Sequence, residues 1–113
     1  MSNRNPSLAI SNGATPTGSA VDTFGGAFLQ LYLNVTAVGA TPTITVIAEA
    51  SPDGSVWAAI TTLTLTATAV GLSMIGKNEG HRMVRLRVSS NTNVTATAYL
   101  TVAGFVYGAW REN

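Results

Sequence analysis

Residues 27–37 read AFLQLYLNVTA, and in this stretch aliphatic side chains occupy every second position. The odd-numbered positions carry Ala, Leu, Leu, Leu, Val and Ala, whereas the even-numbered ones carry Phe, Gln, Tyr, Asn and Thr. A period of two is that of a β-strand, whose successive side chains point to opposite faces of a sheet. The stretch therefore predicts a long strand with an aliphatic face turned to the core and a partly aromatic face on the other side.

The same alternation recurs along the rest of the chain, in which β-branched residues are frequent and no stretch has the spacing and caps of a helix. It is found at residues 43–50, 56–60, 63–65, 84–88 and 94–102, and it continues through Phe105 and Tyr107; a further short strand is expected at residues 72–75. Turn signals lie at residues 39–42, 51–54 (Ser-Pro-Asp-Gly) and 90–93. Short strands separated by turns predict an all-β fold, an antiparallel β-sandwich of jelly-roll or immunoglobulin-like topology.

The first 26 residues differ in composition from the rest of the chain because they contain Pro6, Pro16 and four glycines. We expect an extended N-terminal arm over residues 1–26, with a short strand at residues 7–10, and a single β-sandwich domain over residues 27–113. Arms of this composition fray in isolated domains, so a neighbouring subunit is the expected contact of the arm. The polar start lacks the apolar region of a signal peptide, and we expect no membrane segment.

Charge is scarce in this chain. Its 113 residues include six basic and five acidic ones, which is 10% of the chain and a net charge of +1, against about 25% in a typical soluble domain. Such a balance argues against a nucleic-acid-binding protein, and the absence of cysteine excludes disulfide scaffolds, Cys-zinc sites and thiol nucleophiles. Two interpretations remain open: a surface largely packed against other subunits, or a threonine-rich free surface.

The sequence offers little for catalysis. The few carboxylates form no pair with a recognisable spacing, and His81 is the only histidine. One histidine without cysteine is too few for a typical zinc site, and the chain has neither a Gly-x-Ser-x-Gly motif nor a phosphate-binding loop. We therefore expect no enzyme activity, no cofactor and no metal.

Arginines supply the clearest charged feature. Arg82, Arg85 and Arg87 fall within six residues, and the alternation puts Arg85 and Arg87 on one strand face. Arginine forms forked contacts with carboxylates and is enriched at interfaces, whereas on a free strand the same charges discourage edge-to-edge pairing. The sequence-based hypothesis is that these arginines contact acidic groups of a partner subunit.

Aromatic side chains lie mainly on the outward parity of the strands. A strand with leucine on one face and aromatic residues on the other can be buried on both sides in an oligomer. The candidates for such an interface are Phe28, Tyr32, Tyr99, Phe105 and Tyr107. A flat ring can also stack on a sugar, and Trp57 and Trp110 are the candidates for glycan stacking.

Three segments together resemble small structural proteins of tailed phages. They are residues 31–38 (LYLNVTAV), 41–46 (TPTITV) and 51–57 (SPDGSVW), followed by a strand at 81–88 (HRMVRLRV) and a Thr/Ala-rich run at 95–102. The resemblance covers residues 27–102, and its Ser-Pro-Asp-Gly-x-x-Trp turn also occurs in other β-sandwich modules. It implies a structural component of the virion and carries over no catalytic residue.

The expected function is that of a capsid decoration or cement protein, which binds and stabilises the assembled phage head. The expected partners are the major capsid protein and copies of the chain itself, for example in a trimer, with no nucleic acid and no membrane. The expected location is the capsid surface of the virion, after synthesis in the host cytoplasm. The alternatives are a structural protein of the phage tail or neck, or a carbohydrate-binding β-sandwich module.

Overall fold

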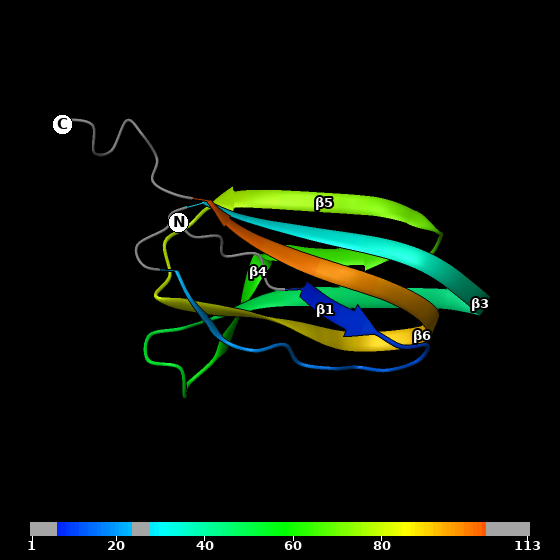
Figure 1. Ribbon diagram of the computed structural model, residues 1–113, viewed down its shortest axis with the longest axis horizontal. Coiled ribbons are helices and arrows are strands. Elements are labelled where there is room, and N and C mark those ends of the chain that lie inside the picture. The colour runs from blue at the N-terminus through cyan, green and yellow to red at the C-terminus, as the bar shows by residue number, and fades with distance from the viewer. Residues whose placement is uncertain (1–6, 24–27, 104–113) are drawn as a thin grey trace.

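The computed structural model describes residues 7–23 and 28–103, and these form an all-β structure (Figure 1). The strands are β1 (Ser7–Ile10), β2 (Val21–Asp22), β3 (Phe28–Ser51), β4 (Ala58–Ala67), β5 (Gly71–Asn78) and β6 (Met83–Ala103). Every strand pair is antiparallel. The all-β prediction is confirmed. The described residues include no helix that could span a membrane.

Two long strands, β3 and β6, form the spine of the molecule. They pair from Phe28 opposite Ala103 to Ser51 opposite Met83, with register shifts on the way. Figure 1 shows that both strands bend back together at one end, so that their two parts lie in opposite halves of the structure. The β5 half contains β1, residues 94–103 of β6, residues 28–38 of β3 and β5; the β4 half contains β2, residues 83–92 of β6, residues 43–51 of β3 and β4.

The expected sandwich of two separate sheets is not confirmed, because the strands belong to one six-stranded antiparallel sheet that folds over. The expected turns at residues 39–42 and 90–93 are bends within β3 and β6 rather than strand ends. Pairing skips from Val38 to Thr43, and both Thr41 and Asn93 have positive φ angles, 45° and 55°. The Asn93 side chain donates a hydrogen bond to the Ala40 carbonyl at 2.7 Å, which joins the two bends.

The core lies between the two halves. Alternate residues of β3 and β6 point inward in both halves, and one cluster of buried side chains joins them. On β3 this cluster contains Leu29, Leu31, Leu33, Val35, Ile44, Val46 and Ala48. The alternation seen in the sequence therefore predicts which side chains form the core, and burial of their apolar surface is the main driving force for the fold.

The N-terminal segment closes one edge of the folded sheet. Ser7–Ile10 pairs with residues 96–99 of β6, and Val21–Asp22 pairs with residues 83–84. Between them, the Gly18 amide donates to Leu86 O (2.8 Å) and the Val88 amide donates to Pro16 O (3.0 Å). The short strand expected at residues 7–10 is confirmed. Within the chain, β6 pairs with this segment, and contact of the N-terminal arm with a neighbouring subunit stays a prediction.

The opposite edge has no such cover among the described residues. There β4 and β5 each pair with β3 alone. The two pairings differ in regularity: β5 matches β3 residue for residue from Val35 to Phe28, whereas β4 carries a register shift between Ile47 and Glu49. The β5 edge is therefore a regular row of backbone groups, and β3 is the described strand that pairs with β5.

Candidate functional site

Three groups of outward side chains are candidates for function, and the first surrounds Glu49 in the β4 half. Glu49 stands opposite Arg85, and Arg87 stands opposite the nearby Ile47. The Nε atoms of Arg85 and Arg87 donate to Oε1 and Oε2 of Glu49, each at 2.8 Å. Burial raises the pKa of Glu49, but the hydrogen bonds and charges of the two arginines outweigh burial and hold its pKa below the ordinary value.

The Glu49 cluster affects the hypothesis that Arg82, Arg85 and Arg87 contact acidic groups of a partner subunit. Two of the three arginines already have an acidic partner within the chain, and Arg85 also lies over the ring of Trp57, 4.2 Å from its centroid. Arg82 is separate from them: it precedes β6, is exposed, and lines an open pocket beside β4. Contact of these arginines with acidic groups of a partner subunit stays a prediction, now with a competing internal acceptor.

Trp57 is a sequence-based candidate for glycan stacking, and one face of its ring is covered by the Arg85 guanidinium. This cation–π contact accounts for Trp57 without a sugar. The second candidate, Trp110, and the candidate interface residues Phe105 and Tyr107 lie outside the described residues.

The Ser-Pro-Asp-Gly turn next to this cluster has a structural role. Ser51 Oγ accepts the Gly54 amide at 2.7 Å, and Asp53 Oδ1 accepts the amides of Ser55 (2.9 Å) and Val56 (3.2 Å). These hydrogen bonds stabilise the carboxylate and lower the pKa of Asp53 to about 2. Gly54 has a φ of 87°, and a Cβ there would lie 3.0 Å from the Met83 sulfur, so glycine suits the position for two reasons.

The second candidate is the open pocket of about 660 Å³, lined by both ends of the Ser51–Ala58 connection, by β4 and by the loop before β6. In it, Glu79 Oε1 lies 3.0 Å from His81 Nε2, and Thr62 donates to Glu79 Oε2 at 2.8 Å. The bonds from His81 and Thr62 lower the pKa of Glu79. The Thr62 hydroxyl therefore bonds the Glu79 carboxylate, which in turn contacts the His81 imidazole. No cluster of three metal-ligating side chains exists among the described residues.

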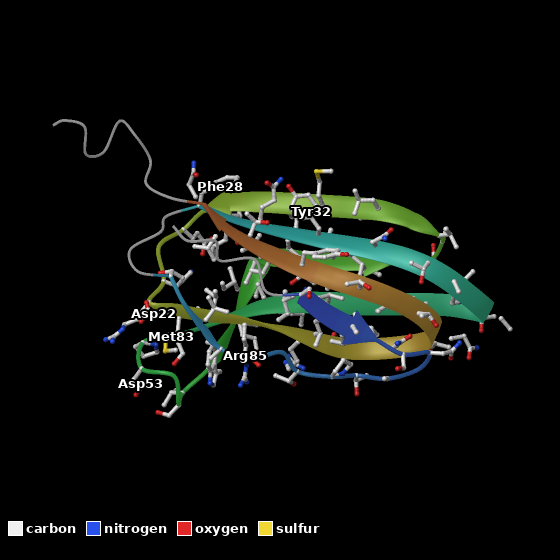
Figure 2. The ribbon with its side chains drawn as sticks, viewed as in Figure 1. Asp22, Phe28, Tyr32, Asp53, Met83 and Arg85 are labelled. Carbon is white, nitrogen blue, oxygen red and sulfur yellow. The ribbon has the colours of Figure 1, made fainter. Side chains whose placement is uncertain are left out.

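The third candidate is the outer surface of the β5 half, which we call the neutral face. It consists of the outward side chains of β1, β5, the first part of β3 and the second part of β6, and none of these described positions carries a charge. Its middle row runs from Tyr99 through Tyr32 to Met74, which are cross-strand partners. Figure 2 shows Phe28 and Tyr32 on the β5 side of the molecule and Asp53, Met83 and Arg85 on the opposite side.

The neutral face brings together three of the aromatic residues selected from the sequence: Phe28, Tyr32 and Tyr99. The ring of Phe28 lies over Gly76, where a Cβ would come within 2.9 Å of it. The sequence reasoning missed Leu72 and Met74, which are 57% and 53% exposed on the same face. Their alternation is visible in the sequence, but only the pairing of β5 with β3 puts them beside Tyr32.

No protein-family model matches the chain, and no curated protein matches it in sequence. The SPBc2 prophage-derived protein YomS is similar in structure, with a TM-score of 0.55 and 10% identity over 91% of this chain and 96% of YomS. A protein of Bacillus endospore appendages, which form disulfide-linked pili, gives a TM-score of 0.44 and 13% identity over 90% of this chain and 89% of that protein. At these identities the likeness to YomS is a likeness of fold.

Proposed function

We propose that the chain is a structural protein of a phage particle, and that it decorates the capsid, binding the assembled head and stabilising it. The partners in this proposal are the major capsid protein and further copies of the chain. The observation that carries the proposal is the neutral face, on which large apolar side chains stay exposed although the core is closed.

The size of the neutral face supports a binding role. Three neighbouring strands followed over about eight residues, together with the four residues of β1, cover roughly 440 Å². On this uncharged surface Leu72, Met74 and Tyr99 are exposed together, and apolar side chains gathered on one face are typical of binding surfaces. Tyrosine and methionine are also enriched in interfaces.

Two further observations point to a virion. Residues 27–102 resemble small tailed-phage structural proteins, and the fold resembles that of a prophage-derived protein. In the proposed mechanism the protein binds the finished shell and not its free subunits, so that binding shifts the equilibrium toward the shell by mass action. The proposed mechanism requires no chemical step.

Binding to heads tests this proposal. Heads of the phage that encodes the chain, assembled without it, are mixed with the purified protein and sedimented. We expect saturable binding and a higher temperature of head disruption. The double variant Tyr32→Ser/Tyr99→Ser should bind at least about 30-fold more weakly, because large aromatic side chains at the centre of an interface contribute most to affinity.

The matched control is Val56→Ser/Val70→Ser, which removes two apolar side chains that are 66% and 62% exposed but lie outside the neutral face. It should bind heads like the wild type. If the wild-type protein does not bind heads, and electron microscopy of particles finds it on the tail or neck, capsid decoration is wrong. If both double variants bind equally well, the neutral face is not the binding surface.

A further inference from the structure

The free edge of β5 (Gly71–Asn78) carries a second inference. In the described structure, the N-terminal segment pairs with both parts of β6 on one side of the molecule, whereas β5 on the other side is hydrogen-bonded as a strand to β3 alone. A strand edge exposes backbone amides and carbonyls that can pair with another strand, and natural proteins block such edges with charge, bulges or cover. Within residues 7–23 and 28–103, none of these devices is found at the β5 edge between Gly71 and Gly76.

The β4 edge is less suitable for the same purpose. Its pairing with β3 is interrupted by the register shift between Ile47 and Glu49, and irregularities of this kind twist an edge away from a partner. The β5 edge is regular over all eight residues and has Leu72 and Met74 exposed beside it.

We infer that β5 pairs in an antiparallel manner with β5 of a second copy, about a two-fold axis through Met74. The second copy is favoured because the strand is self-complementary in this register. Met74 then stands opposite its own counterpart, and Leu72 stands opposite Gly76 of the second copy, next to the Phe28 ring that covers that glycine. An isologous contact of this kind closes as a dimer, unlike the trimer considered from the sequence.

Charge also fits this register. Lys77 is the charged residue within β5, and it comes to stand opposite Gly71 of the second copy, where a Cβ would meet no atom within 4 Å. The two lysines are then six positions, or roughly 20 Å, apart, which exceeds the Debye length of about 8 Å at physiological salt. The pairing would extend the neutral face without a break across both copies, since facing residues of an antiparallel pair share a face.

The β5–β5 pairing rests on the proposed function, in which copies of the chain bind one another, and specifies how they do so. It is tested on the isolated protein without heads, so a failure of the pairing can be distinguished from a failure of head binding. Single-cysteine variants give a clean readout because the chain has no cysteine. Directly opposed residues of antiparallel strands have Cα atoms about 4.5–5.5 Å apart, within the range of a disulfide. Met74→Cys should therefore form a covalent dimer on mild oxidation, whereas Val56→Cys, 66% exposed in a loop as wild-type valine, should not.

A variant that adds charge provides the second test of the pairing. Met74→Glu places two carboxylates opposite each other, and we expect it to weaken self-association about 100-fold; Val56→Glu is the matched control. Sedimentation up to about 100 µM protein should find the wild type and Val56→Glu as dimers and Met74→Glu as a monomer, with circular dichroism confirming that each is folded. A wild type that stays monomeric, a trimer, an unchanged mass for Met74→Glu, or equal cross-linking of both cysteine variants would each overturn the inference.

Discussion

The outer surfaces of the two halves are built on the same pair of strands and yet differ in kind. On the β4 half, β3 and β6 carry Glu49, Arg85 and Arg87, whose charges are satisfied by one another. On the β5 half, the same strands carry Tyr32 and Tyr99, and the adjacent β5 adds Leu72 and Met74, with no charge among them. On the outer surface of the β4 half, Glu49 is paired with arginines of the same chain. On the outer surface of the β5 half, apolar side chains are exposed to solvent.

The difference between the two surfaces shows that charged residues of this chain are placed where they stabilise the fold. A nearly buried carboxylate needs partners, and Arg85, one of the two arginines that bond Glu49, also covers Trp57, so the charged cluster has a sufficient structural role. The neutral face has no comparable role in the monomer. We therefore expect substitutions in the Glu49 cluster to change stability and substitutions on the neutral face to change binding.

The largest expected effect on stability comes from Glu49. Glu49→Ala leaves Arg85 and Arg87 side by side without an acceptor, and because both are partly exposed we expect a loss of about 2 kcal/mol, less than for a fully buried pair. Urea unfolding measures it. Tyr99→Thr on the neutral face should change stability by less than about 0.5 kcal/mol, and equal losses for the two variants would remove the distinction between the faces.

The triple variant Glu49→Thr/Arg85→Thr/Arg87→Thr serves as the control for that result. Replacing every member of an ion cluster leaves no unpaired charge, so this variant should be more stable than Glu49→Ala. If it is less stable, the arginines contribute through packing rather than through their contact with Glu49.

A smaller effect is expected from pH. Because the folded-state pKa of Glu49 is lowered, its stabilising contribution is present at neutral pH and is lost as the pH falls below the ordinary value of 4.5 and through the folded-state pKa. Glu49→Gln should therefore be less stable than the wild type at pH 7, and the gap should narrow in acid. Unfolding curves from pH 7 to about pH 3 test this. A gap that widens in acid would contradict the assigned role of the carboxylate.

The smallest effect concerns Trp57. Loss of the cation–π contact in Trp57→Leu should cost about 1 kcal/mol, seen as a small shift in thermal unfolding. Since Arg85 covers one face of the ring, tryptophan fluorescence of the wild type should stay unchanged across a panel of glycans. A saturable shift that disappears in Trp57→Leu would restore the carbohydrate-binding alternative.

Much of the fold could be predicted because side-chain alternation is a local signal. The alternation in residues 28–35 shows which of these residues enter the core, and the 51–54 turn is determined by its own hydrogen bonds. The contact of Glu49 with Arg85 spans 36 residues and depends on strand pairing that no local pattern reveals. The same holds for Leu72 and Met74, whose place beside Tyr32 follows from the pairing of β5 with β3.

The folding-over of the sheet could not be predicted either. Residues 39–42 and 90–93 have the composition of turns, and in isolation each would end a strand. Because the two segments lie opposite each other in a continuous pair of strands, they bend together instead, and the Asn93–Ala40 hydrogen bond joins them. Because the two turn-like segments lie side by side in paired strands, the result is one folded sheet and not two separate sheets.

Hydroxyl-radical footprinting of the protein, free and bound to phage heads, tests the central claim most directly. Tyrosine, methionine and tryptophan are readily oxidised where they are exposed, so both faces report in one experiment. We predict that binding protects Tyr32, Tyr99 and Met74 on the neutral face and leaves Trp57 and Met83 near the Glu49 cluster unchanged. Protection of Trp57 and Met83 with none at Tyr99 and Met74 would contradict the assignment of the neutral face as the binding surface.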